Sequence, residues 1–183
     1  ERNYRSMSRA KVLVICHDAG GAEIVSAYIL AHQQRYRFFV FVSGPAMKIF
    51  RRKRIAAVLF EDQSFHDFFV AHPDVLFVLA GTGASGMEAR AIASARARGI
   101  KTVAFLDHWV NYRERFRYPE AGWEAHLPDE IWVGDQYGYQ LAKECFSHVI
   151  IRLVSNPYFQ EVRASYRGAV ARATQHDAIL FMS

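Results

Sequence analysis

The chain has 183 residues, 51% of them hydrophobic, and a formal net charge of +5. This apolar content excludes a disordered chain and is enough for the core of one large domain. No apolar run approaches the roughly 20 residues that cross a bilayer, and the polar start lacks the apolar region of a signal peptide. The two cysteines show neither metal-ligand spacing nor a disulfide framework. We therefore expect a cytoplasmic protein without a metal site.

Apolar runs alternate with helical patterns along the chain. Strands are predicted at residues 11–16, 37–42, 55–60, 74–80, 102–106, 130–133 and 148–154. Helices are predicted at residues 22–32, 46–52, 64–71, 136–146 and 157–174, with Ser64 and Asp135 as caps and Pro157 in a first turn, and a helical pattern covers residues 87–101. This alternation predicts an α/β fold: a doubly wound, Rossmann-like parallel sheet of about seven strands in three α/β/α layers, ordered 3-2-1-4-5-6-7.

One domain is predicted over residues 7–177. A further apolar run, AILFM, follows the last predicted helix at residues 178–182. A strand that begins after a long helix is how a second α/β domain starts. We therefore expect residues 178–183 to be the first strand of a C-terminal domain that this sequence does not contain.

A glycine-rich turn, Gly81-x-Gly83-x-x-Gly86, links the strand at residues 74–80 to a helix. Such a turn lets backbone N–H groups approach a phosphate at a helix N-terminus. Asp107 ends the next strand, where dinucleotide-binding units place the acid that binds a ribose hydroxyl. However, those units normally begin on the first strand. Three interpretations stay open: NAD-type binding, a turn shaped for a sugar, phosphate or acceptor, and turn geometry alone.

The turn HDAGG (residues 17–21) follows the first strand. Asp18 can act as a general base for a hydroxyl, and His17 can share that role. Equally, Asp18 can simply cap the following helix. In the predicted order the first and fourth strands are neighbours at the switch point, where such sheets bind ligands. The HDAGG and GTGASG turns should therefore line one cleft from opposite sides.

The segment after the fifth strand is the densest cluster of polar and aromatic residues. His108 can take a proton, since histidine is the side chain that changes its charge near neutral pH. Trp109 and Tyr112 can stack on a sugar ring, and Arg113 and Arg115 can pair with phosphates through their planar guanidinium groups. The alternative is a structured loop held by its own Asp–Arg and Glu–Arg pairs.

The roles of Glu88 and of the residues before the last predicted helix also stay open. Glu88, in the first turn of its helix, either stabilises the helix start or binds a hydroxyl across the cleft. Ser155 or Asn156 caps the last helix, and that tip also faces the cleft. Ser85 does not belong to a G-x-S-x-G nucleophile elbow, and no Walker motif is present.

Arginines and lysines cluster at residues 51–54, 90–98 and 113–117. These clusters are either solvated surfaces or patches that attract anionic lipid headgroups or phosphorylated substrates. No recognised nucleic-acid-binding pattern accompanies the charge, so nucleic acid is not an expected partner.

The layout resembles the N-terminal domain of a GT-B glycosyltransferase. The resemblance rests on the segments ICHDAGGAE, GTGASGMEARA, FLDHWVNYRERF, PDEIWVGDQYGYQLAKE and LVSNPYF, and it covers nearly the whole chain from Lys11. The layout is similar to that of bacterial polysaccharide-biosynthesis proteins, including CDP-glycerol glycerophosphotransferase-like and UDP-N-acetylglucosamine 2-epimerase-like members.

This resemblance implies a domain that binds the acceptor and supplies the base, while a C-terminal domain binds most of the nucleotide sugar. Asp18 or His108 would be the catalytic base. The expected substrate-binding residues are His17, Gly20, Gly21, Gly81, Thr82, Gly83, Glu88, Asp107, Trp109, Asn111, Arg113, Arg115 and Asn156.

The implied function is transfer of a sugar or related group from a nucleotide-activated donor to an acceptor hydroxyl in cell-surface polysaccharide biosynthesis. The expected partners are the donor, a saccharide or lipid-linked acceptor, and an anionic membrane touched peripherally at its inner face. No cofactor is expected. The alternatives are an NAD-dependent oxidoreductase or epimerase using the GTGASG turn and Asp107, and a non-catalytic nucleotide- or sugar-binding module.

Overall fold

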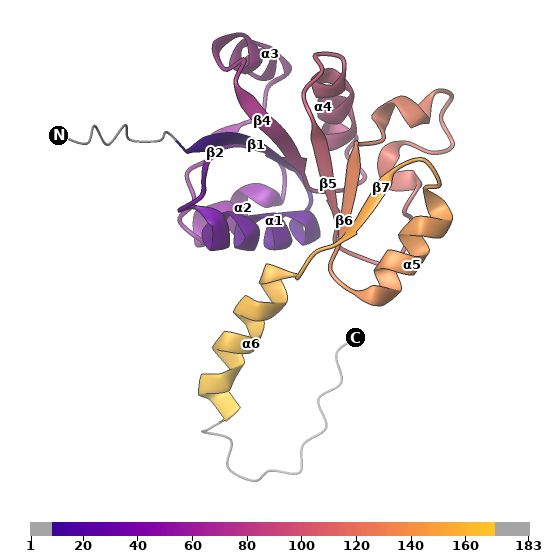
Figure 1. Cartoon of the computed structure of the whole chain (residues 1–183). Coiled ribbons are helices and arrows are strands. Elements are labelled where there is room, and N and C mark those ends of the chain that lie inside the picture. The colour runs from indigo at the N-terminus through magenta and orange to yellow at the C-terminus, as the bar shows by residue number, and fades with distance from the viewer. Residues whose placement is uncertain (1–8, 171–183) are drawn as a thin grey trace, which may run out of the picture.

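The computed structural model describes residues 9–170, which form a seven-stranded sheet flanked by helices (Figure 1). The strands are β1 (Ala10–Cys16), β2 (Tyr36–Val42), β3 (Val58–Leu59), β4 (Val75–Ala80), β5 (Thr102–Leu106), β6 (Glu130–Val133) and β7 (Ile150–Leu153). The α-helices are α1 (Ala19–His32), α2 (Ala46–Arg52), α3 (Asp62–Ala71), α4 (Met87–Arg96), α5 (Gln136–Cys145) and α6 (Pro157–Val170). Two 3₁₀ helices, η1 (Glu114–Phe116) and η2 (Trp123–His126), lie in the β5–β6 connection.

All neighbouring strands pair in parallel, in the order β3-β2-β1-β4-β5-β6-β7. The predicted fold class and strand order are therefore confirmed. The order reverses between β1 and β4, so the loops after these two strands leave the sheet side by side.

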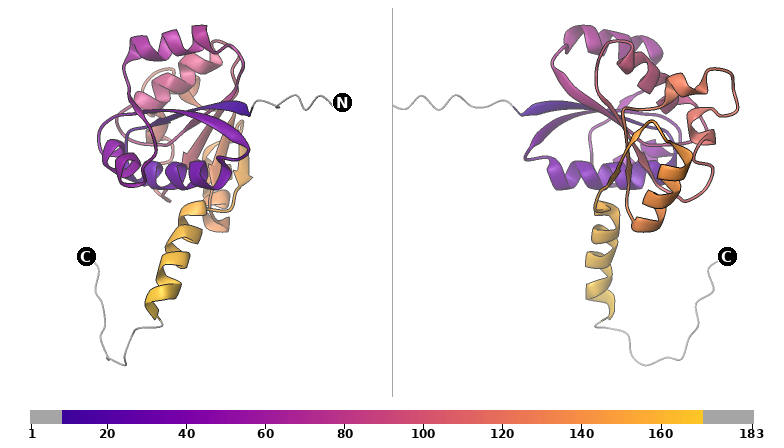
Figure 2. Two further views of the ribbon diagram at one scale, coloured as in Figure 1. Left: turned by 90° about the vertical axis from the view of Figure 1, so that its left-hand side faces the viewer. Right: turned by 45° about the vertical axis from the view of Figure 1, so that its right-hand side comes forward.

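Alternate residues of the central strand β1 pack on opposite faces of the sheet. Val12 and Val14 belong to the core beneath α1 and α2, and Leu13 and Ile15 belong to the core on the other face. Figures 1 and 2 show α1 and α2 on one face and α3 and α4 on the other. Burial on both faces explains why the strands read as continuous apolar runs.

The last two helices begin as the sequence predicts. Asp135 caps α5 by accepting the backbone N–H of Gly138 at 2.7 Å. Asn156, rather than Ser155, caps α6, because its Oδ1 accepts the N–H of Tyr158 at 3.0 Å. Helix α6 starts against α1 and then runs away from the rest of the domain (Figures 1 and 2).

Three predicted boundaries are wrong. Helix α1 begins at Ala19, so the HDAGG glycines lie in its first turn rather than before it. Strand β3 contains two residues instead of six, because it pairs only with the end of β2 at the sheet edge. Helix α3 begins at Asp62, so Ser64 lies inside it and is not its cap.

The predicted end of the last helix at residue 174 and the predicted strand at residues 178–182 lie outside the described residues. The proposed division into domains 7–177 and 178–183 therefore stays a prediction.

Candidate functional site

The loops after β1 and β4 touch each other, as the strand order predicts. The backbone N–H of Ala84 donates to Asp18 Oδ2 at 3.1 Å, and the N–H of His17 donates to Glu88 Oε1 at 2.7 Å. A Cβ at Gly81 would lie 3.1 Å from Cys16 Sγ. The two turns therefore form one structural unit at the carboxyl edge of the sheet.

The glycines of these turns are needed for close packing. A Cβ at Gly20 would overlap Oδ2 of Asp107, and a Cβ at Gly83 would overlap the carboxylate of Asp18. At Gly21 a Cβ would lie 3.0 Å from the backbone nitrogen of Thr82. At these positions a carboxylate or the backbone of the same chain occupies the space that a side chain would need. Close packing within the chain therefore explains the glycines without a ligand.

His17 and Asp18 form a hydrogen-bonded pair in the β1–α1 loop. His17 Nδ1 lies 2.5 Å from Asp18 Oδ1, while the other carboxylate oxygen holds the Ala84 N–H. The imidazole packs against Gly44, where a Cβ would come within 2.5 Å of Nε2. Within residues 9–170, His17 Nε2 has no hydrogen-bond partner. Asp18 therefore orients the ring, and Nε2 lies beside Gly44 without a hydrogen bond to another described residue.

The carboxylate of Glu88 fills the turn that was a candidate phosphate cradle. Glu88 is 3% exposed, and its two oxygens accept from the His17 N–H and from Ser85 Oγ. The Met87 N–H at the start of α4 donates to Ser85 Oγ at 3.2 Å. Asp18 likewise accepts the Ala84 N–H. Three backbone N–H groups around this turn, those of His17, Ala84 and Met87, therefore already donate to side chains of the same chain, and a phosphate would have to compete for them. The geometry therefore does not favour NAD-type binding at this turn, and it favours the helix-start role of Glu88.

Asp107 forms a half-buried ion pair with Arg115. Arg115 Nη1 lies 2.5 Å from Asp107 Oδ1 and 3.0 Å from Oγ1 of Thr82, which is itself buried. Arg115 thus ties the segment after β5 to the β4–α4 turn. A phosphate could recruit Arg115 only in competition with Asp107.

Arg113 points elsewhere. Its Nε donates to the carbonyl of Cys145 at 3.2 Å, at the C-terminus of α5. For Arg113 and Arg115, the alternative of a loop held by its own contacts describes the observed structure better than free phosphate-binding groups.

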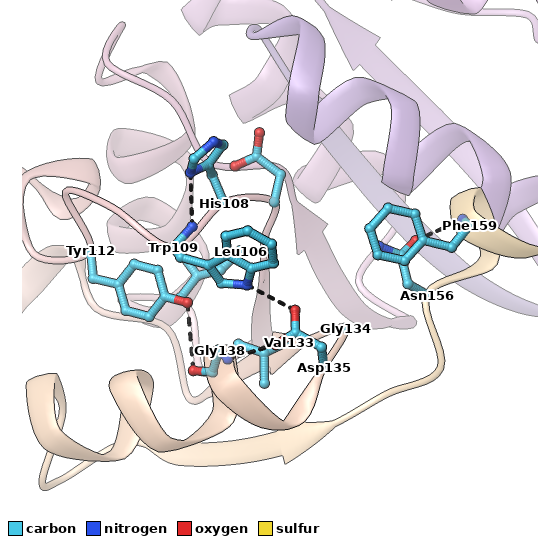
Figure 3. Close-up of a pocket in the computed structure, with 11 residues that line it drawn as sticks. Leu106, His108, Trp109, Tyr112, Val133, Gly134, Asp135, Gly138, Asn156 and Phe159 are labelled. Carbon is cyan, nitrogen blue, oxygen red and sulfur yellow. Dashed lines mark hydrogen bonds between the residues drawn. The ribbon is translucent and has the colours of Figure 1, made fainter. Parts of the chain in front are cut away.

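A cavity of about 210 Å³ opens between the segment after β5, the β6–α5 turn and the start of α6 (Figure 3). Of the predicted residues, Asp107, His108, Trp109 and Asn156 line it. Trp109 Nε1 donates to Asp135 Oδ2 at 2.9 Å, which holds the indole at the cavity edge.

His108 is exposed, and its Nδ1 accepts the backbone N–H of Trp109 at 2.9 Å. A neutral histidine that accepts at Nδ1 carries its hydrogen on Nε2. His108 is therefore arranged to donate a hydrogen bond from Nε2, and not to take a proton there.

Tyr112 is buried behind the cavity, and its hydroxyl donates to the carbonyl of Gly138 at 3.5 Å. Burial and then the charge of Asp135 raise the pKa of Tyr112 to about 12. Its ring stacks on Phe146 rather than facing a ligand. Tyr112 is thus a wall of the cavity and stays protonated at neutral pH.

A smaller cavity of about 180 Å³ lies between the two turns and the segment after β5, lined in part by Asp18, Gly83 and Asn111. Asn111 adopts a left-handed backbone with φ of 56°, a conformation that asparagine tolerates better than most residues. Fourteen of the fifteen predicted site residues follow β1, β4 or β5, and Asn156 lies between β7 and α6. Arg113 donates to the end of α5 and contacts neither turn.

Sequence reasoning missed Phe159 and the second role of Asp135. Phe159 lies in the first turn of α6 and lines the cavity opposite Trp109 (Figure 3). The LVSNPYF segment signalled a helix start at the cleft, but not which aromatic residue faces the cavity. Asp135 was recognisable only as a cap.

Several arginine and lysine side chains of the predicted basic clusters form ion pairs with nearby acidic residues. Arg52 and Lys53 both pair with Glu23, and Arg96 pairs with Asp129. Among the described residues, no group of three or more His, Cys, Asp or Glu side chains is placed to hold a metal ion. Over the same part of the chain, no helix is both long and apolar enough to cross a membrane.

The fold is that of a Rossmann-like α/β domain, and the candidate site residues lie at the carboxyl edge of its sheet. No family model and no curated protein sequence matches the chain. A protein described as a UDP-N-acetylglucosamine 2-epimerase from Listeria monocytogenes superposes with a TM-score of 0.62 at 11% identity, over 85% of this chain and 47% of that one.

The glycotransferase of kitacinnamycin superposes with a TM-score of 0.52 at 11% identity, over 81% of this chain and 52% of that one. The chain thus spans about half the length of both structures. At this identity the likeness concerns the fold, which is that of a GT-B-like domain.

Proposed function

We propose that the chain is the acceptor-binding half of a glycosyltransferase, which transfers a sugar or related group from a nucleotide-activated donor to an acceptor hydroxyl. The observation that carries the proposal is the His17–Asp18 pair at the switch point, with a Nδ1–Oδ1 distance of 2.5 Å. The two similarly folded proteins, by their descriptions a nucleotide-sugar epimerase and a glycotransferase, support a nucleotide sugar as partner.

His17 is the preferred base in this proposal. Its Nε2 takes the proton of the acceptor hydroxyl, the oxygen attacks the anomeric carbon of the donor, and the bond from that carbon to the phosphate oxygen breaks. Asp18 accepts the Nδ1–H and stabilises the imidazolium that forms, as carboxylates do in histidine-based catalysis.

Asp18 and His108 are weaker candidates for the base. Both oxygens of Asp18 already accept hydrogen bonds, from His17 and from Ala84. His108 accepts at Nδ1 and so carries its hydrogen on Nε2. Asp18 is accordingly proposed as a positioning residue and His108 as a hydrogen-bond donor to substrate.

The proposal includes a setting in cell-surface polysaccharide biosynthesis, in the cytoplasm and at the inner membrane face. Lys48 and Arg51 on α2 and Arg54 just after it are exposed, make no ion pair within residues 9–170 and could meet anionic lipid. Binding to vesicles with and without anionic lipid tests this part separately.

The test of the function is acceptor-dependent release of nucleotide from a panel of nucleotide sugars by the full-length protein that carries this chain. His17→Ala and Asp18→Asn should each lower kcat about 100-fold or more. His66→Ala, an exposed histidine on α3, should match the wild type. Wild-type turnover by His17→Ala would reject His17 as the base, and the absence of transfer with every donor would reject the function.

A further inference from the structure

The cavity in Figure 3 has two aromatic walls that come from distant parts of the chain. Trp109 follows β5, and Phe159 lies in the first turn of α6. Their side chains stay 51% and 50% exposed, although large aromatic side chains usually bury most of their surface. A groove between two half-exposed rings offers stacking surfaces for the flat face of a ring-shaped ligand.

The cavity offers both hydrogen-bond donors and hydrogen-bond acceptors, as the hydroxyl groups of a sugar require. Asn156 is 7% exposed and uses Oδ1 to cap α6, so its Nδ2–H₂ group remains as a donor. His108 offers a second donor at Nε2, as its Nδ1 contact requires. The carboxylates of Asp107 and Asp135 supply acceptors. A sugar hydroxyl both donates and accepts, and this set serves both functions.

The charges of the cavity disfavour anions. Two carboxylates, those of Asp107 and Asp135, line it, and neither lysine nor arginine is among the described lining residues. Arg115 contacts one of these carboxylates, and its charge is taken up in the ion pair with Asp107. A uronate or a sugar phosphate would therefore meet the negative charge of Asp135 without an unpaired cation among the described lining residues, which disfavours it relative to the neutral sugar.

The size of the cavity fits one sugar unit. About 210 Å³ is below the roughly 300–1,000 Å³ of pockets for drug-sized ligands. Asp107 lines the cavity, and its Oδ2 packs against Gly20 in the first turn of α1. The cavity thus adjoins the start of α1 through Asp107, while Asp18 lines the smaller cavity.

From these observations we infer that the cavity between Trp109 and Phe159 is a subsite for one neutral pyranose unit, and that it selects uncharged sugars against uronates and sugar phosphates. The inference rests on the proposed function for its assignment to the acceptor. The cavity itself can be tested by binding alone.

The experiment measures binding of methyl glycosides to the wild-type protein by saturation-transfer NMR and competition. The neutral probes are methyl glucoside, galactoside, mannoside and N-acetylglucosaminide, and the charged probes are methyl glucuronide, glucose 1-phosphate and UMP. At least one neutral glycoside should bind, and the charged probes should bind about tenfold or more weakly.

Variants separate the cavity from general effects. Trp109→Ala and Phe159→Ala should each weaken neutral-sugar binding about tenfold, whereas Trp109→Tyr should retain most of it. Tyr166→Ala removes another aromatic from α6 that is 64% exposed, and it should leave binding unchanged.

Equal or tighter binding of the charged probes, failure of every neutral probe to bind, or wild-type binding by Trp109→Ala would overturn the inference. Neutral-sugar binding without transfer from any donor would retain the subsite and reject the glycosyltransferase proposal. Transfer to a uronate acceptor in preference to its neutral counterpart would retain the glycosyltransferase proposal and reject the neutral-sugar subsite.

Discussion

Ala84 donates its backbone N–H to Asp18 Oδ2 over 3.1 Å, and this bond joins the loop after β4 to the loop after β1. The residues are 66 positions apart in sequence, yet they meet because β1 and β4 are neighbours where the strand order reverses. The contact also holds the carboxylate that orients His17. The packing of the switch point and its proposed chemistry therefore depend on the same few contacts.

Gly20→Ala should destabilise the domain by about 1–3 kcal/mol, because the new Cβ would displace Asp107 from its contact with Arg115. Urea denaturation measures the change in the free energy of unfolding. In an Asp107→Ala background the same substitution should cost less, since the overlapping carboxylate is gone. Equal costs in the two backgrounds would show that the overlap does not determine the effect.

Glu88→Ala should cost about 1–3 kcal/mol in unfolding free energy, because the partly buried His17 N–H loses its acceptor. Glu88→Gln should cost less, since an amide oxygen can still accept this bond. Chemical denaturation of both variants provides the comparison. Glu144→Ala, at an exposed position on α5, should stay within about 0.5 kcal/mol of the wild type. A wild-type stability for Glu88→Ala would contradict this role.

Glu130 should make part of the stability depend on acid pH. Burial alone would raise the pKa of Glu130, but hydrogen bonds from Arg152, Lys101 and Trp132 outweigh burial and lower the pKa from 4.5 to about 2. Because the folded state holds fewer protons than the unfolded state, this contribution is full above about pH 4.5 and is lost as the pH falls toward 2.

Unfolding free energies measured from pH 6 down to pH 2 should therefore fall more steeply for the wild type than for Glu130→Gln. Glu120→Gln, which removes a carboxylate that is 53% exposed, is the matched control and should follow the wild type. Parallel pH profiles of the unfolding free energy for the wild type and Glu130→Gln would show that Glu130 does not cause the loss of stability in acid.

Asp135 should have two separable roles, because Oδ1 caps α5 and Oδ2 holds the indole of Trp109. Asp135→Asn keeps an oxygen for the Gly138 N–H and should remain close to wild-type stability. Asp135→Ala should lose about 1 kcal/mol. In both variants the Trp109 indole N–H should exchange with solvent faster in NMR spectra. Unchanged exchange would show that the indole is held by packing alone.

Local signals in the sequence predicted the elements well. Asp135 was recognisable as a cap because its partner, Gly138, lies only three residues away. Strand β5 and strand β6 have the predicted bounds, since continuous apolar runs mark strands buried on both faces. The errors at α1 and β3 arose where glycines tolerate a helix start and where an edge strand lacks a second neighbour.

The site was predictable in position but not in roles. For Arg115 the sequence left two alternatives open, phosphate binding and an Asp–Arg pair within the loop, and only the fold shows that Arg115 pairs with Asp107. His108 looked like a base until its contact with the Trp109 N–H assigned its proton. Phe159 could not be paired with Trp109, because 50 residues of chain separate two rings that the sheet brings to one cavity.

The sequence by itself determined the α/β alternation, the strand order and the edge of the sheet where polar residues gather, because hydrophobic periodicity and chain connectivity are properties of short segments. The tertiary structure decided which of those polar groups neutralise one another and which remain open to a ligand. Hydrogen bonds and ion pairs depend on distances of a few ångströms between residues that are far apart in the chain, and these distances exist only after folding.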